Sequence, residues 1–135
     1  MTVQNSVAVR DARLDAWEVA IGTSAIMKIR SGAQPANCAA ADSGTVLATL
    51  NLPADWMGAA SGGTKAMLGT WADNSADATG VAAHYRIYAS NGTTCHDQGT
   101  VTLTGGGGDL TVDNTNFSAG QAFSVTQFTK TAGNA

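Results

Sequence analysis

The stretch "VAAHYRIYASNGTTCHDQGTVTLT" (81–104) decides the fold, because it joins two alternating segments through a turn signal. Alternation of apolar and polar residues with a period of two is typical of a half-buried β-strand. In 81–88 it places Val81, Ala83, Tyr85 and Ile87 inward, and His84, Arg86 and Tyr88 outward. The Asn91–Gly92 pair is a strong signal for a tight turn. The stretch therefore predicts two consecutive antiparallel strands.

Similar segments recur along the rest of the chain. They are "AIMKIR" (25–30), "TVLATLNL" (45–52), "KAMLGTW" (65–71), "DLTVD" (109–113) and "AFSVTQFT" (122–129). Glycine-rich runs separate them, and we expect the "GGGG" run (105–108) to be a flexible hairpin tip. Many short strands at close spacing predict a mainly β fold, an antiparallel β-sandwich or jelly-roll-like barrel.

The beginning of the chain has a helical pattern instead. Its apolar stripe, with steps of three, four or seven, consists of Val3, Val7, Leu14, Trp17 and Ile21. Arg10 interrupts this stripe, Asn5 or Ser6 could cap the helix, and Gly22 is placed to end it. The helix either packs on its own domain or docks on a neighbouring subunit. We divide the chain into an N-terminal helix or arm (1–22) and a single β-sandwich domain (23–135).

Composition narrows the possible partners. Charged residues make up only 13% of the 135 residues, against about 25% in an average protein. The net charge is −3 without a cluster of Lys or Arg, so we expect no nucleic-acid partner. No apolar run approaches the roughly 18 residues of a membrane helix, and we expect no membrane partner. The first residues lack the features of a signal peptide, which predicts synthesis in a cytoplasm.

Residues that could carry chemistry are present without a recognisable spacing. Candidate metal ligands are Cys38, Asp42, His84, Cys95 and His96. Cys95 and His96 are adjacent, and adjacent residues of a strand point to opposite faces of a sheet. Neither CxxC nor HxxxH occurs, so we expect no metal and no cofactor.

Catalytic constellations are equally hard to find. No "GxSxG" occurs, and "GGGGD" (105–109) lacks the ending of a phosphate-binding loop. The candidate paired carboxylates are Asp55, Asp73, Asp77, Asp97 and Asp109. Most lie in expected turns, where Asp is favoured because it bonds the local backbone. The sequence therefore predicts a protein that is not an enzyme.

Tryptophans and cysteines have alternative roles. We expect Trp17, Trp56 and Trp71 to anchor the core or a subunit interface rather than to bind a sugar. Cys38 lies in "SGAQPANCAAADSGT" (31–45), a shaped loop between two expected strands. Cys38 and Cys95 are either two separate buried thiols or a disulfide that closes a loop of about 57 residues. Such a disulfide would contribute about 4 kcal/mol.

Four stretches together resemble a known family. They are "VRDARLDAWEVAIG" (9–22), "IRSGAQPANCAAADSGTVLATLNLPADW" (29–56), "HYRIYASNGTTCHDQGTVT" (84–102) and "DNTNFSAGQAFSVTQFT" (113–129). Over nearly the whole chain, the sequence resembles small virion proteins of tailed bacteriophages and prophages. Within that group it looks most like capsid decoration (cement) proteins or minor capsid proteins. Lys28 departs from the pattern, which has an acidic residue before "IR".

The resemblance implies a structural role without catalytic residues. Such proteins sit on the outer capsid of the virion, bind the major capsid protein and commonly form homotrimers on local three-fold axes. The residues that we expect to contact neighbours are Val7, Leu14, Trp17, Pro35, Asn37 and Trp56. Other possible roles are a tail, tail-tip or receptor-binding component, a ring protein of the neck, or a small virion-associated hydrolase.

Overall fold

The structure is a computed structural model that describes residues 3–132. This part of the chain folds into one helix followed by eleven strands, which confirms the mainly β fold with an N-terminal helix. The elements are α1 (Val7–Ile21), β1 (Ile26–Arg30), β2 (Val46–Asn51), β3 (Thr64–Ala66), β4 (Trp71–Asp73), β5 (Gly80–Val81), β6 (His84–Tyr88), β7 (Cys95–Leu103), β8 (Leu110–Val112), β9 (Asn116–Phe117), β10 (Phe123–Val125) and β11 (Thr129–Thr131).

The largest sheet of the described residues has five strands in the order β2-β1-β6-β7-β8. Strand β6 pairs antiparallel with both β1 and β7. The predicted tight turn between β6 and β7 is confirmed: the Gly92 N–H donates to the Ala89 carbonyl at 2.9 Å. Gly92 has a φ of 73°, a left-handed conformation that glycine adopts without steric cost. The stretch 81–104 therefore contains β6 and β7, which lie in the middle of the largest sheet.

The glycine run at 105–108 is not a hairpin tip. Strands β7 and β8 are parallel, with Val101 opposite Leu110, so the chain doubles back beside its own strand. The Gly108 N–H donates to Thr102 Oγ1 at 3.0 Å. A Cβ on Gly106 or Gly108 would lie 2.8 Å from the Thr102 side chain, so these two positions require glycine because their backbone packs on β7, whereas Gly105 and Gly107 are exposed and have positive φ angles. The expectation of a hairpin tip was wrong because the two strands that the run joins are parallel.

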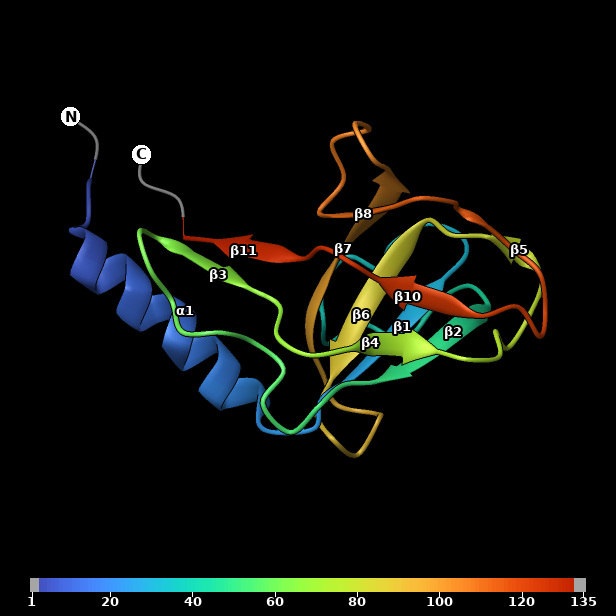
Figure 1. The fold of residues 1–135 in the computed structure, drawn as a ribbon, viewed down its shortest axis with the longest axis horizontal. Helices are drawn as coiled ribbons and strands as arrows, with labels where there is room; N and C mark the ends of the chain where they lie inside the picture. Colours follow the sequence, from blue (N-terminus) through green and yellow to red (C-terminus); the bar gives the residue numbers. More distant parts are fainter. Residues whose placement is uncertain (1–2, 133–135) are drawn as a thin grey trace.

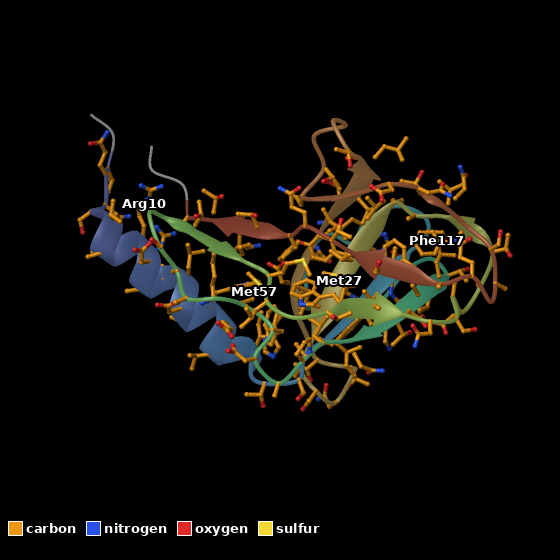
Figure 2. All side chains as sticks on the ribbon, in the orientation of Figure 1. Arg10, Met27, Met57 and Phe117 are labelled. Atoms are coloured by element: carbon orange, nitrogen blue, oxygen red, sulfur yellow. The ribbon has the colours of Figure 1, made fainter. Side chains whose placement is uncertain are left out.

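Short strand pairs complete the body and extend it. The pair β4–β10 lies in front of the large sheet in this view, where β4 contacts β2, and β5, which pairs with β9, lies at the right-hand end of the body (Figure 1). The pair β3–β11 leaves the body on one side, and α1 lies along it (Figure 1). Among the labelled side chains, Arg10 marks the α1 end of the molecule and Phe117 lies in the body at the other end (Figure 2).

A chain of aromatic rings connects the body to α1. Trp17 of α1 packs on Trp56 with ring centroids 5.3 Å apart, and Trp56 packs on Trp71 at 5.9 Å. Phe128 continues the chain to Tyr85 of β6. Trp56 and Trp71 are fully buried, which confirms the prediction that tryptophans anchor the core. Helix and body therefore share one apolar core.

The prediction for the second face of β6 was wrong. His84, Arg86 and Tyr88 do share a face, but all three side chains are buried rather than exposed. The reason is that residues 31–45, here called the strap, fold back over this face. The alternation correctly divided the two faces of the strand, yet only tertiary structure shows that both faces are covered.

The helix begins and ends where the sequence predicts. Ser6 is the N-cap, and its hydroxyl accepts a hydrogen bond from the Val9 N–H at 3.3 Å. Gly22 ends the helix with a φ of 94°, and its N–H donates to the Glu18 carbonyl. These contacts satisfy backbone groups that a helix terminus leaves without intrahelical partners.

Candidate functional site

The strap is held to the sheet by the guanidinium of Arg86. Arg86 projects from β6, is 1% exposed, and donates to the carbonyls of Asn37, Cys38 and Ala40 at 3.1–3.3 Å. It also donates to the carboxylate of Asp42. One buried side chain therefore fixes the strap at four residues between Asn37 and Asp42, a geometry to which the planar fork of five donors in arginine is suited.

Asp42 gathers the other polar groups of this face. Its carboxylate accepts a hydrogen bond from the Tyr88 hydroxyl at 2.7 Å and pairs with Arg30 at 3.1 Å. Partial burial raises the pKa of Asp42, but the bonds from Tyr88 and Arg86 and the charge of Arg30 lower it more, so the net shift is downward. Asp42 is therefore ionised at neutral pH and balances part of the buried positive charge.

The two ends of the strap are fixed as well. His84 Nδ1–H donates to the Gly32 carbonyl at 2.9 Å, and Gln98 Nε2 donates to the Pro35 carbonyl at 2.8 Å. At the base, the Ser31 N–H donates to the Thr45 carbonyl. Gly44 turns there with a φ of 72°, and a Cβ at this position would collide with the Ser31 carbonyl. The strap is thus bound to the body along its whole length.

Burial of these groups is incompletely compensated. Four polar atoms under the strap have no hydrogen-bond partner within residues 3–132, namely Arg30 Nε, His84 Nε2, Arg86 Nε and Gln98 Oε1. Burial lowers the pKa of His84, and the charges of Arg30 and Arg86 act in the same direction. His84 is therefore neutral at neutral pH. The contact between the strap and this face of the sheet is structural, and its stability depends on the charge states of Asp42 and His84.

A second candidate region is the outer side of α1. The inner side of the helix carries polar contacts: Lys65 of β3 is 2% exposed and binds Asp15 at 2.7 Å and Glu18 at 2.8 Å. Arg10 Nε donates to the Ala132 carbonyl at 2.8 Å, and Asp11 accepts from the Gly63 N–H at 2.7 Å. The arginine that interrupts the apolar stripe therefore points inward.

The side that faces away from β3 is mostly apolar, with Arg13 exposed at its edge. Spacings of three and four place six exposed residues there, called the outer face: Ala8, Val9, Ala12, Ala16, Val19 and Ala20. Val19 is 79% exposed and Val9 is 45% exposed. A surface helix normally buries its apolar stripe and exposes its polar one. In α1 much of this arrangement is reversed, and Leu14, Trp17 and Ile21 are the apolar residues that it does bury or partly bury.

The sequence-predicted contact residues divide between core and surface. Leu14 and Trp56 are 4% and 0% exposed, so the expectation that they contact a neighbour is corrected: both are buried inside this chain. Trp17 is partly buried against Trp56. Val7 is half-exposed, and no observation on the described residues tests its contact role. Sequence reasoning missed the outer face, although the spacing of Val9, Ala12, Ala16 and Val19 carries the signal.

The strap residues also occupy different positions. Asn37 is exposed, and its side-chain oxygen accepts from the Ala40 N–H at 2.9 Å. Pro35 is partly exposed and its carbonyl is bound by Gln98. Their contact with a neighbour stays a prediction.

Two of the candidate carboxylates lie near one hollow. The Tyr85 hydroxyl donates to Asp97 at 3.0 Å, and Lys130 binds the same carboxylate at 2.7 Å. Asp109 lines a hollow of about 330 Å³ together with Tyr85 and Lys130. Its carboxylate accepts from the Thr100 N–H and hydroxyl. Each carboxylate is thus occupied by donors of the chain itself, and burial raises the pKa of Tyr85 far above its usual range.

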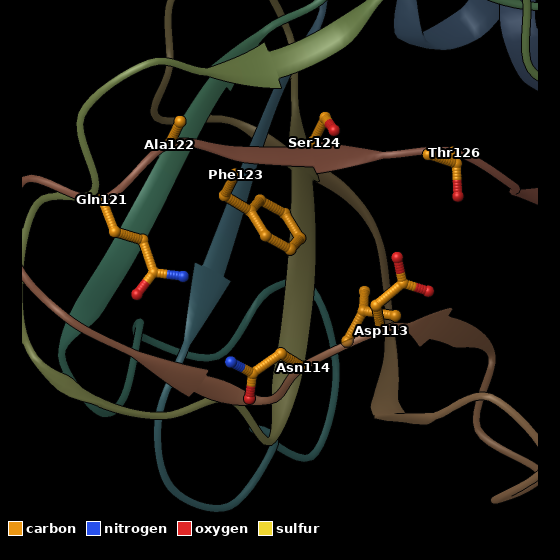
Figure 3. A pocket seen from close by; sticks show the side chains of 8 residues that line it. Asp113, Asn114, Gln121, Ala122, Phe123, Ser124 and Thr126 are labelled. Atoms are coloured by element: carbon orange, nitrogen blue, oxygen red, sulfur yellow. The ribbon is translucent and has the colours of Figure 1, made fainter.

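A smaller hollow of about 200 Å³ lies beside β10 (Figure 3). Gln121, Asn114 and Phe123 line it. The Asn114 side chain accepts from the Asn116 N–H, and the Gln121 side chain accepts from the Ser118 N–H. Phe123 stacks on Phe117 with centroids 4.6 Å apart. These side chains shape turns of the barrel wall.

The remaining candidates are scattered. Over the described range, no three His, Cys, Asp or Glu side chains come together as a metal site would require. Asp73 accepts a hydrogen bond from the Thr49 N–H at 2.9 Å, and Asp77 accepts one from the Thr49 hydroxyl at 2.7 Å. Within residues 3–132 the helix is also too short and too polar to cross a bilayer. Comparison with protein-family models, curated proteins and solved structures found no match to this chain.

Proposed function

We propose that this protein is a non-enzymatic structural protein that binds the outer capsid of a tailed bacteriophage and stabilises it. The observation that carries the proposal is the outer face of α1. Apolar side chains on a helix are normally buried because their removal from water stabilises the fold by about 25 cal/mol per Å². Val9 and Val19 are exposed, so much of their apolar surface does not contribute this stabilisation in the single chain. A contiguous apolar face of this kind is typical of protein–protein contact.

The way in which α1 is attached supports this role. The ion pairs of Lys65 with Asp15 and Glu18 fix the helix to β3, and the packing of Trp17 on Trp56 joins it to the core. The outer face is therefore presented on a rigid element, which lowers the ordering entropy that binding would otherwise cost. Because charged residues make up only 13% of the chain, contact with a lattice also requires little desolvation of charge.

The capsid as partner follows from the resemblance to small virion proteins. A decoration protein requires no chemistry: by binding the assembled lattice and not the free subunit, it shifts the equilibrium toward the intact shell. In this proposal the protein is made in the bacterial cytoplasm, joins the capsid surface as a homotrimer, and contacts the major capsid protein through the outer face. The strap closes the sheet and preserves the fold on the particle.

The test is binding to empty shells assembled from the major capsid protein encoded with this chain. Replacing Val9→Asp and Val19→Asp together is expected to weaken co-sedimentation by more than about tenfold, because a carboxylate would be buried without a partner. Val81→Asp is the matched control, since Val81 is 57% exposed on β5, away from α1. Unchanged binding of the double variant would reject the role of the outer face. Binding to purified tails but not to shells would favour a tail or neck component.

A further inference from the structure

The strap brings its single cysteine to the second cysteine of the chain. Cys38 is fixed in place because Arg86 donates to its carbonyl and to that of Asn37, both at 3.1 Å. Cys95 lies in β7 directly opposite Tyr88, two residues from Arg86 on the same face of β6. Tyr88 in turn bonds Asp42 of the strap. The two cysteines, far apart in sequence, therefore sit at one contact between strap and sheet.

The two thiols interact in this position. Both side chains are partly exposed, and neither is bonded in a disulfide within the described residues. Burial raises the pKa of Cys95 to about 12, and a side-chain hydrogen bond with Cys38 contributes to the rise. The Cys95 thiol also donates to the Asp97 carbonyl at 3.4 Å. The interaction places the two thiols next to each other, which a disulfide between them requires.

We propose that Cys38 and Cys95 form an intrachain disulfide when the protein meets a low-molecular-weight disulfide such as oxidised glutathione, and that this bond locks the strap onto the sheet. The strap is otherwise held by hydrogen bonds and ion pairs that exchange with water when it opens. A covalent bond in its middle prevents that opening. The inference is independent of the capsid role, because it rests only on contacts within one chain.

The reaction is an ordinary thiol–disulfide exchange. The Cys38 thiolate attacks one sulfur of oxidised glutathione, which forms a mixed disulfide and releases one glutathione thiolate. The Cys95 thiol then loses its proton and attacks the Cys38 sulfur, which releases the second glutathione. Two protein thiols are oxidised, two glutathione molecules are formed, and their thiolates take up the two protons. The raised pKa of Cys95 makes the second step slow at neutral pH and faster as the pH rises.

The bond closes a loop of about 57 residues between the two cysteines. Closing a loop of this length removes entropy from the unfolded chain, and for a protein of this size it raises Tm by about 10 °C. Protection of the strap amides increases as well, because its local opening is prevented.

The experiment incubates the full chain with oxidised and, separately, reduced glutathione at pH 8. We expect the oxidised sample to lose two hydrogens in mass, to resist alkylation after denaturation, and to yield a cross-linked Cys38–Cys95 peptide. Tm should rise by about 10 °C and fall back on addition of dithiothreitol. Hydrogen exchange in 31–45 should slow in the oxidised sample alone. Because the reduced sample has the same sequence, misfolding of a variant cannot explain a difference.

Cys95→Ser is the second control. We expect it to stop at the glutathione adduct on Cys38, with no rise in Tm. Two thiols that stay open to alkylation in the native sequence, or that form only adducts or interchain dimers, would overturn the disulfide. A bond that forms without slowing exchange in 31–45 would overturn the claim that it locks the strap.

Discussion

The strap and α1 are each attached to the body through a buried cation of their own, but they differ in the side chains that they expose to solvent. Arg86 holds the strap and Lys65 holds α1, with exposures of 1% and 2%. Beneath the strap, Arg86 contacts backbone carbonyls and a carboxylate, and the strap closes over them. On α1, Arg10, Asp11 and Glu18 contact the body, and the apolar side chains of the outer face remain in water. The comparison separates a segment that completes the fold from one that is available for contact.

The largest expected effect is on the strap. Arg86→Met leaves three buried strap carbonyls without their donor and removes one of the three partners of Asp42, so we expect a loss of about 3–5 kcal/mol in the free energy of unfolding. Urea denaturation measures it, together with faster hydrogen exchange in 31–45. Arg13→Met, at an exposed position of α1, is the matched control and should change stability by less than about 0.5 kcal/mol. An equal effect of both variants would remove the structural role assigned to Arg86.

Loss of the cation that holds α1 is expected to cost less. Lys65→Met frees Asp15, which is 53% exposed and can be rehydrated, and Glu18, which is 20% exposed. We expect a loss of about 1–2 kcal/mol, since water screens the exposed partner and the buried charge itself disappears. The readouts are urea denaturation and hydrogen exchange in 7–21. A loss as large as that of Arg86→Met would contradict the difference between the two regions.

The strap face should also respond to acid. Burial lowers the pKa of His84 in the folded chain, so the unfolded chain binds a proton first as the pH falls. Stability is therefore fully present above the unfolded pKa of about 6.5 and decreases as the pH falls below it. Asp42 adds a decrease only at lower pH, because its folded pKa is itself lowered.

His84→Asn keeps a donor for the Gly32 carbonyl and removes this titration. Its free energy of unfolding should change less between pH 7 and pH 5 than that of the native sequence, as measured by urea denaturation at each pH. The same exchange at exposed His96 serves as control. A slope that stays the same in His84→Asn would show that another group carries the pH dependence.

The smallest effect on stability is expected at the outer face of α1. Val9→Asp with Val19→Asp should change the free energy of unfolding by less than about 1 kcal/mol, because both positions are exposed. Leu14→Ala, on the buried side of the same helix, should cost about 2–4 kcal/mol. Thermal or urea denaturation compares them. If the outer substitutions destabilise the chain as much as Leu14→Ala, the outer face belongs to the core rather than to a contact surface.

Sequence patterns predict local structure in this chain better than its tertiary contacts. The period of two in 84–88, the Asn91–Gly92 turn and the Ser6 cap depend on neighbouring residues only, and all three were predicted. The alternation does not extend to Val81, which was expected inward but is exposed on β5. The strap depends on Arg86, more than forty positions away, and nothing in the local pattern shows that Arg86 would be covered. The parallel β7–β8 pair was missed because glycine runs usually mark exposed turns, whereas here the absence of side chains permits close packing on Thr102.

The candidate sites show the same limit. The two cysteines were recognised as a possible pair, but only the strap brings them together. The outer face was missed because the stripe through Leu14, Trp17 and Ile21 fits a conventional surface helix, and the inward contacts of Arg10 and Asp15 reverse part of that interpretation. A helical pattern with an arginine in its apolar stripe therefore justifies inspection of the opposite side for a second apolar stripe.

A reconstruction of the assembled phage particle tests the central claim most directly. The proposed capsid role predicts copies of this protein over the whole outer shell. Val9 and Val19 of α1 should be buried against the major capsid protein, and the strap should be turned toward its own sheet. Density confined to the neck or tail, or a shell-bound protein whose α1 outer face points into solvent, would contradict it.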